Sequence, residues 1–437
     1  PGGMGGVYNT RLVSYYPEGE LPASVNTLAD EDLPLFTPRN QILYSNPVNN
    51  KNDNPRIFLK SILKPLKGLE AVFEYTFDKN IYDYHWYTGQ YDYTTIQGGS
   101  SKSFVDDYLR KYKQHTNYNS INVYATYNKD FGNHHFKVMA GFNQESSYQE
   151  TLDTYSYNQA VLDVPAMSSG TGTIKATDSY SEYAIRGGFF RVNYNYLDKY
   201  LLEVNGRYDG SSKFPKSSRF GFFPSVSAGW QIAQERFMNS TRHWLDGLKL
   251  RASYGVIGNQ NINPYTFTPS MSVNNKATSW IIDDTYVTSI SSLPALVSQN
   301  FTWEKVGTIN VGLDVNLFNN RLSGVFEWYQ RNTNGMLAPG VQLPAVVGAS
   351  APYQNTADMR TRGWELSLNW RDQIGKVGYR IGFNLSDYKS EIIKYDDNAA
   401  TKLLSSYYPG QTLGEIWGYV VDGYYTVDDF VDTSSWQ

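Results

Sequence analysis

The chain has 437 residues, of which 41% are hydrophobic and 18% are charged, and its formal net charge is −4. This slight excess of acid argues against a nucleic-acid partner, which would require a basic surface. The sequence contains no cysteine, so neither a disulfide nor a thiolate metal site can form. Aromatic residues reach 16%, with 37 tyrosines and 10 tryptophans, and both types suit the boundary between a membrane and water.

The first 54 residues are rich in Pro, Asn and Gly, and we expect them to form a loop region. Beyond them, segments of alternating apolar and polar residues come in pairs, each pair joined by a short turn. The predicted hairpins are 56–63 with 69–78, 119–127 with 135–146, 184–196 with 200–208, 220–232 with 247–257, 303–317 with 321–331, and 361–371 with 376–387. The link between 220–232 and 247–257 is longer, and we expect a helical turn in it.

Each predicted strand has one apolar and one polar face, because successive side chains point to opposite sides of a strand. In residues 306–317, for example, Ile309, Val311 and Leu313 share one face, while Asn310 and Asp314 share the other. A water-filled barrel would turn the polar face inward. The charged residues that we expect to face the lumen on this basis are Arg191, Arg207, Arg251, Arg380, Glu203 and Glu365.

Long segments separate the hairpins, at 79–118, 147–183, 209–219, 258–302, 332–360 and 388–437. A soluble sandwich shows the same alternation but has turns at both ends of its strands, and several structureless loops of this length are unusual in a compact soluble domain. Very short connections alternating with very long ones, with about ten residues per strand, are typical of an outer-membrane β-barrel. No apolar run is long enough for a transmembrane helix.

We therefore predict an all-β fold, a transmembrane antiparallel β-barrel in the outer membrane. About twelve strands lie within residues 55–388, with short periplasmic turns and long extracellular loops, and 1–54 and 389–437 are extracellular loop regions. The aromatic residues on the apolar faces gather near the short turns, as an interfacial girdle should. They are Tyr127, Tyr196, Tyr200, Trp230, Trp370 and Tyr379.

The sequence lacks the motifs of common enzymes, including G-x-x-x-x-G-K-[ST], H-E-x-x-H, G-x-S-x-G and C-x-x-C, and we expect no catalytic site. His134 and His135 face opposite ways on a strand and have no third ligand nearby in the sequence, so we expect no metal there. Acidic pairs at 106–107, 283–284, 396–397 and 428–429 fall in predicted loops, where solvated charge is the simpler interpretation. No cofactor is expected, and calcium on the loops or on a partner protein stays open.

One aromatic segment is a candidate for contact with a ligand or with a protein lid, because aromatic faces stack on sugar rings and anchor interfaces. Its members are Tyr82, Tyr84, Trp86, Tyr87, Tyr91 and Tyr93. The alternative is an extended extracellular strand with ordinary cross-strand aromatic pairs. The lumen-facing arginines likewise have two interpretations: contacts to neighbouring strands or to an internal domain, or contacts to the transported solute.

Five stretches resemble the SusC/RagA-type TonB-dependent outer-membrane transporters of Bacteroidetes. They are NYLDKYLLE at 195–203, RYDGSSKF at 207–214, FFPSVSAGW at 222–230, LKLRASYG at 248–255 with GNQ at 258–260, and TRGWELSLNW at 361–370. The resemblance covers roughly residues 55–425. It implies a barrel of about 22 strands with an N-terminal plug and a SusD-like surface lipoprotein as lid. It also implies import of oligosaccharides or peptides with energy delivered through TonB.

The plug, the TonB-contacting segment and the last strands of such a transporter are not in this sequence, and the C-terminal region leads toward those missing strands. Energy-coupled transport is therefore implied by the resemblance alone. The alternative is a passive structural barrel, a porin or a surface adhesin without TonB coupling. A soluble carbohydrate-active enzyme is a third hypothesis, disfavoured by the aromatic girdle and by the absent motifs.

Overall fold

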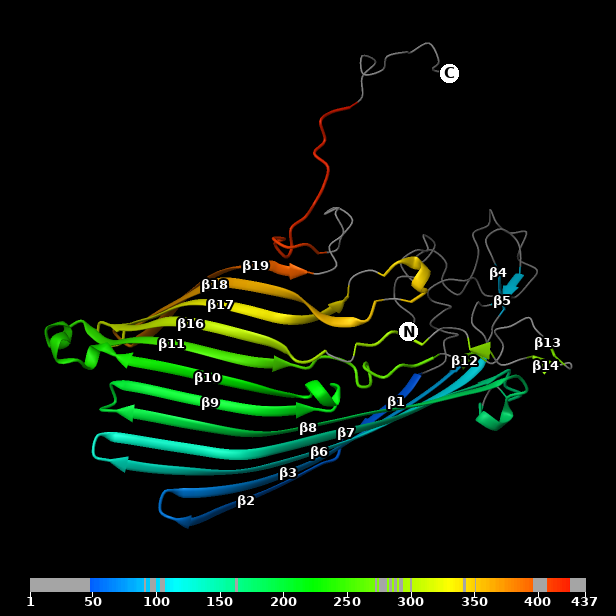
Figure 1. Ribbon diagram of the computed structural model, residues 1–437, viewed down its shortest axis with the longest axis horizontal. Helices are drawn as coiled ribbons and strands as arrows, with labels where there is room; N and C mark the ends of the chain where they lie inside the picture. The colour runs from blue at the N-terminus through cyan, green and yellow to red at the C-terminus, as the bar shows by residue number, and fades with distance from the viewer. Residues whose placement is uncertain are drawn as a thin grey trace.

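An antiparallel sheet of 13 strands forms nearly the whole of the computed structural model (Figure 1). The structure describes residues 48–89, 92–94, 100–102, 107–161, 164–271, 273–274, 281–282, 285–286, 289–290, 294–298, 301–340, 343–349, 351–395 and 407–424. Among these residues, no helix has the length and apolar character needed to cross a membrane.

Strand order in the sheet follows the chain. The strands are β1 (Val48–Asp53), β2 (Arg56–Leu66), β3 (Leu69–Thr88), β6 (Tyr108–Phe131), β7 (His134–Tyr157), β8 (Ile174–Tyr196), β9 (Tyr200–Ser211), β10 (Phe220–Gln231), β11 (Leu245–Asn259), β16 (Glu304–Leu317), β17 (Leu322–Pro339), β18 (Tyr353–Ile374) and β19 (Val377–Tyr395). β1 and β2 pair with successive parts of β3, and β19 forms the opposite edge, so the sheet is not closed.

Short ladders and short 3₁₀-helices occupy the connections. The ladders join β4 (Asp92–Thr94) to β5 (Ser100–Lys102), β12 (Val273–Asn274) to β15 (Ser289–Ile290), and β13 (Ile281–Ile282) to β14 (Thr285–Tyr286). The 3₁₀-helices are η4 (Met167–Ser169), η5 (Lys216–Ser218), η6 (Ile232–Gln234), η7 (Arg236–Thr241) and η8 (Ala345–Val347). The helical turn expected between β10 and β11 is therefore present as η6 and η7.

All the short turns lie at one end of the sheet, which we call the turn end, and the long connections lie at the other, the loop end (Figure 1). Each predicted hairpin is an adjacent antiparallel pair of strands in this sheet. The tightest turns use left-handed backbone, as in the β8–β9 turn, where Leu197 has φ 57° and Asp198 has φ 56°. Two consecutive residues with positive φ match the twist of a hairpin.

Several strands extend much further toward the loop end than the sequence indicated. Residues 79–88, 108–118, 147–157 and 174–183 were expected to be loop but lie in β3, β6, β7 and β8. β1 likewise falls in the expected loop region 1–54, and β19 continues to Tyr395 in the region expected to be loop from 389. These extensions carry polar and aromatic residues on both faces, so no apolar alternation marks them, and cross-strand hydrogen bonds hold them instead.

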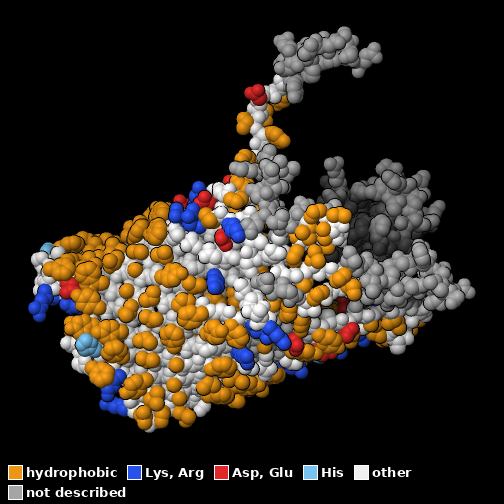
Figure 2. All heavy atoms as spheres, in the orientation of Figure 1, with side chains coloured by type: hydrophobic (Ala, Val, Ile, Leu, Met, Phe, Trp, Pro, Cys, Tyr) orange, Lys and Arg blue, Asp and Glu red, His pale blue; other side chains and the backbone are white. Residues whose placement is uncertain are grey.

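The apolar face of the sheet is exposed, as the lipid-facing side of a barrel would be. Apolar side chains of the predicted lipid face are open, with Val123 45% and Leu250 40% exposed. Figure 2 shows such hydrophobic side chains spread over the strands, with few Lys and Arg side chains scattered among them. A soluble sandwich would bury this apolar face, so the exposure favours a surface covered by lipid.

Candidate functional site

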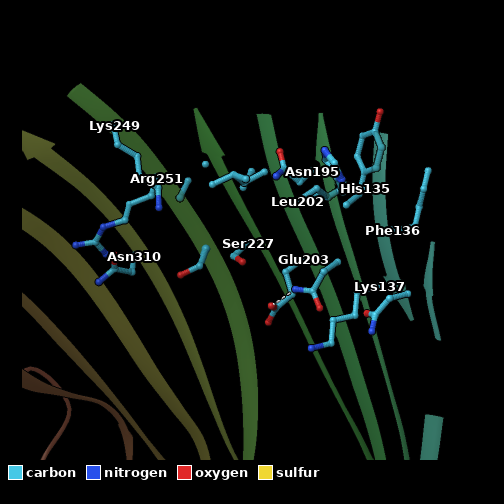
Figure 3. A pocket seen from close by; sticks show the side chains of 18 of the residues that line it. His135, Phe136, Lys137, Asn195, Leu202, Glu203, Ser227, Lys249, Arg251 and Asn310 are labelled. Atoms are coloured by element: carbon cyan, nitrogen blue, oxygen red, sulfur yellow. Dashed lines mark hydrogen bonds between the residues drawn. The ribbon is translucent and has the colours of Figure 1, made fainter. Parts of the chain in front are cut away.

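The polar face of the sheet, which we call the inner face, lines an open groove of about 670 Å³. Figure 3 shows Lys137 of β7, Glu203 of β9, Arg251 of β11 and Asn310 of β16 around this groove. Because β7 and β16 are not neighbours in the sheet, the sheet must curve for both to line one cavity. The inner face is therefore concave, as the wall of a lumen would be.

Arg251 is the centre of a charge network across three strands of the inner face. Its Nε lies 3.2 Å from Asp314 Oδ1 of β16, and its guanidinium also pairs with Glu327 of β17. Asn310 donates a hydrogen bond of 3.2 Å to the same Glu327 carboxylate. Two carboxylates and one amide thus fix the guanidinium, which leaves little free charge for a solute.

The other predicted lumen residues also bond to the barrel wall. Arg191 donates to Asn205 at 2.7 Å and lies 3.8 Å from Glu203, which accepts a further bond from Asn205. Arg207 makes a two-pronged contact to Asp209 at 3.0 and 2.9 Å and stacks on Phe189.

At the β19 edge of the sheet, Arg380 donates to Asn369 of β18 at 3.0 Å. Glu365 of β18 lies directly opposite Glu327 of β17. Of the two interpretations of the arginines, contacts to the barrel wall are thus present at all four. Contacts to a solute stay a prediction.

A second groove of about 520 Å³ continues the inner face toward the loop end and meets an aromatic cluster there. The aromatic cluster consists of Phe214, Phe223, Phe301 and Trp303, which are at most 8% exposed. Phe214 and Trp303 have ring centroids 5.0 Å apart, and Phe223 meets Trp303 edge-on at 5.2 Å. Sequence reasoning missed this cluster, because Phe214 and Phe301 come from segments that were expected to be loop, and because the four residues are far apart in the chain.

Hydrogen bonds join two connections and one strand around the aromatic cluster. Ser218 donates to the Phe301 carbonyl at 2.8 Å, and the Trp303 indole donates to the Arg219 carbonyl at 2.9 Å. Asn355 of β18 accepts from the Thr302 amide at 2.9 Å and donates to the Thr302 carbonyl at 3.0 Å. The end of the β11–β16 connection is therefore held against both the β9–β10 connection and β18.

Three residues of the predicted aromatic segment form a wall on the inner face near the loop end. Phe73 points outward on β3 and is 43% exposed, so the even-numbered Tyr82, Tyr84 and Trp86 of the same strand point inward. Tyr82 meets Tyr112 of β6 edge-on at 5.9 Å, and Trp86 meets Tyr108 at 5.7 Å.

The tyrosine wall, as we call Tyr82, Tyr84, Trp86, Tyr108, Tyr112 and Tyr155, surrounds a single arginine. The guanidinium of Arg110 lies 5.3 Å from the Tyr155 ring and 5.5 Å from the Tyr84 ring. Asp153 binds it with two hydrogen bonds of 2.9 and 2.8 Å, and this contact raises the pKa of Arg110. No pattern in the sequence indicated this pairing, which joins strands β6 and β7.

The remaining predicted aromatic residues do not belong to the wall. Tyr87 points to the other face of β3, and burial raises the pKa of its phenol to about 12. Tyr93 lies in β4, and Tyr91 lies outside the described residues. The cross-strand pairs of Tyr82 and Trp86 match the alternative interpretation of an extended strand, while their inward position keeps contact with a solute open.

Among the described residues, no group of three His, Asp or Glu side chains could hold a metal ion. His134 Nδ1 lies 2.8 Å from the Tyr194 hydroxyl, and His135 Nδ1 lies 2.7 Å from Asp130 Oδ1, so both rings contact side chains beside the β6–β7 turn. Of the four acidic pairs, 283–284, 396–397 and 428–429 lie outside the described residues, as does Asp106, while Asp107 accepts a bond from the Gln159 amide.

Known proteins are similar to this chain in sequence and in fold. A family model described as TonB dependent receptor-like, beta-barrel, matches residues 8–435. The chain is 30% identical to TonB-dependent receptor P3 of Formosa agariphila, over 78% of this chain and 35% of that protein. It is 32% identical to TonB-dependent receptor SusC of Bacteroides thetaiotaomicron, over 63% of this chain and 27% of that protein. A structure of the RagAB peptide importer has a similar fold, with TM-score 0.69, 24% identity, and coverage of 80% of this chain and 37% of that one.

The chain therefore belongs to the TonB-dependent receptor-like β-barrel family of outer-membrane proteins. This confirms the resemblance and the barrel fold class inferred from the sequence. The relatives are named as receptors rather than as enzymes, in agreement with the missing catalytic motifs. The chain spans 35% and 27% of the length of these two relatives.

Proposed function

We propose that this chain is part of the wall and outer vestibule of a SusC-like importer in the outer membrane. The complete protein takes up oligosaccharides or peptides with energy delivered through TonB, and a SusD-like lipoprotein acts as its lid. The observation that carries this proposal is the orientation of the two faces of the sheet. The apolar face is exposed, and the polar face lines a concave groove, which is the opposite of the arrangement in a soluble protein. The similarity to SusC and the RagAB peptide importer supports the class.

The charges of the inner face favour a solute without strong net charge. Arg251, Arg207 and Arg110 are each paired with carboxylates in the chain itself. The tyrosine wall then offers aromatic faces and hydroxyls near the loop end, which we place on the extracellular side. Such a surface suits sugar rings and the side chains of short peptides, because both can stack on an aromatic face.

Uptake by cells that carry the complete protein tests this function. We expect Tyr84→Ala with Trp86→Ala to lower uptake of the labelled solute or co-purification of the lipoprotein. His85→Ala is the matched control, because His85 lies between these residues but is exposed on the opposite face of β3. Unchanged uptake and lipoprotein binding in the double variant would leave the segment as an ordinary extended strand.

A second measurement separates the importer from a passive barrel. Collapse of the proton-motive force of the inner membrane should abolish uptake by a TonB-coupled importer and leave diffusion through a porin unchanged. Continued uptake after the collapse would therefore refute energy coupling and favour the passive barrel or adhesin.

A further inference from the structure

The connection between β10 and β11 differs from the short turns around it. Whereas the β8–β9 turn has three residues, this connection runs from Ile232 to Trp244 and contains η6 and η7. It protrudes at the turn end beyond the neighbouring strands (Figure 1). Closing the hairpin needs only a short turn, so the extra residues call for another explanation.

Glu235 fixes this connection to the lipid-facing side of the sheet. Its carboxylate accepts bonds from the Tyr200 hydroxyl at 2.7 Å and the Trp230 indole at 3.2 Å, and it lies 3.2 Å from the Lys199 ammonium. Tyr200 and Trp230 both belong to the exposed apolar face. The connection therefore lies at the end of the apolar belt, as we call the band of exposed apolar side chains on the lipid-facing side of the sheet.

The aromatic surface of the belt continues onto the connection. Phe237 is 65% exposed, and its ring centroid lies 6.5 Å from that of Trp230. Trp244 is also exposed, at the end of the same connection. Exposed aromatic side chains beside a lipid-facing belt are favourable when they enter the interface of the membrane.

A row of polar side chains runs beside these aromatic residues. A 3₁₀-helix has three residues per turn, so residues three apart lie above one another. Arg236, Asn239 and Arg242 consequently share one side of η7 and its C-cap, since Arg242 also has helical backbone angles. Both arginines are exposed, and neither makes an ion pair with any residue that the structure describes.

We propose that the connection Ile232–Trp244 is a binding site for anionic phospholipid, with Phe237 among the acyl chains and Arg236, Asn239 and Arg242 on the head-group phosphates. The inference rests on the proposed function for the position of the barrel in the membrane. Two observations point to a phospholipid as the ligand: the connection continues the apolar belt, and its two guanidinium groups are unpaired within the part of the chain that the structure describes. Guanidinium binds phosphate well, and a phospholipid has both an apolar acyl chain and an anionic phosphate.

Native mass spectrometry of the detergent-purified complete protein, titrated with phosphatidylglycerol or phosphatidylcholine, tests the site. We expect wild type to retain phosphatidylglycerol preferentially. The double variant Arg236→Gln/Arg242→Gln should weaken that retention roughly tenfold and remove the preference. Phe237→Ser should weaken the binding of both lipids, because it removes the acyl-chain contact without changing the charge.

The matched control is Lys129→Gln/Lys376→Gln, which removes two exposed cations at the same end of the sheet. It should leave retention of phosphatidylglycerol essentially unchanged. Equal loss in this control would show general charge attraction and refute the site, as would unaltered retention in the arginine double variant. Heat-modifiable migration on gels verifies that each variant is folded, and solute uptake by the same variants separates loss of the site from failure of the proposed importer function.

Discussion

At the residue scale, the side chains of one strand face two different solvents. On β16, Leu313 pairs with Leu250 on the apolar face, whereas Asp314, one residue further, contacts Arg251 on the inner face. A charge at position 313 would therefore lie in lipid and destabilise the fold, whereas the charge of Asp314 is paired with Arg251. The sequence predicts this division from alternation alone, and the apolar face is exposed in the structure.

Leu313→Arg should destabilise the complete protein by about 2–4 kcal/mol in lipid, because it places a guanidinium among acyl chains. Asp314→Asn is the control on the neighbouring residue, since it removes one of the two carboxylates bound to Arg251 but exposes no charge to lipid. Urea unfolding in vesicles measures both. A larger loss for Asp314→Asn than for Leu313→Arg would contradict the assignment of the two faces.

Leu197→Gly should stabilise the protein, by up to about 1 kcal/mol, because a leucine with φ 57° is strained where glycine is not. Leu197→Ala is the control, since alanine loses the same side chain but keeps the strain. The same urea unfolding distinguishes them. Equal stability of the two variants would show that the turn carries no strain at this position.

At the element scale, side-chain packing and hydrogen bonds hold the long connections against the strands. The aromatic cluster holds the end of the β11–β16 connection against β10 and the β9–β10 connection. Gly258 of β11 allows this packing. A Cβ there would lie 2.3 Å from the Phe223 ring and 2.9 Å from the Trp303 ring.

Gly258→Ala should therefore loosen the aromatic cluster while the barrel stays folded. We expect faster proteolysis of the β11–β16 connection and unchanged heat-modifiable migration on gels. Gly378→Ala in β19 is the control, because no atom lies within 4 Å of a Cβ at that glycine. Identical proteolysis of the two variants would argue that the cluster does not hold the connection.

The β10–β11 connection should respond to acid through Glu235. Hydrogen bonds from Tyr200 and then Trp230, with help from Lys199, lower the pKa of Glu235 below its ordinary 4.5. Because the folded-state pKa is lowered, the stabilisation is complete above about pH 4.5 and is lost as the pH falls through the lowered pKa.

Thermal unfolding of Glu235→Gln and wild type at several pH values measures this effect. The variant should unfold at a lower temperature than wild type at pH 7, and the difference should shrink below pH 4.5 as wild-type Glu235 takes up its proton. A difference that stays constant down to acid pH would show that the charge of Glu235 does not matter.

At the scale of the whole molecule, the two ends of the sheet differ in the length of their connections, and we place the loop end outside the cell. Protease added to intact cells should then cut the connections between β7 and β8 and between β11 and β16. The Asp198–Lys199 and Asn319–Asn320 turns should be cut only after the outer membrane is opened. Cleavage of these turns in intact cells would reverse the assigned orientation.

The sequence by itself determined which segments pair, which side chains share the apolar face of each strand, and the family to which the chain belongs. These properties follow from local alternation and from turns of two or three residues, which neighbouring residues encode. The inward position of Tyr82, Tyr84 and Trp86 also follows from alternation, once β3 is known to continue to Thr88.

Only the tertiary structure decided how far β3, β6, β7 and β8 extend beyond the apolar belt, because their outer parts are stabilised by pairing with one another and not by a pattern within each segment. The pairing of Arg110 with Asp153, the aromatic cluster, and the contacts of Glu235 with Tyr200 depend in the same way on residues far apart in the chain. Such contacts exist only after the sheet has formed, so no periodicity in the sequence could have revealed them.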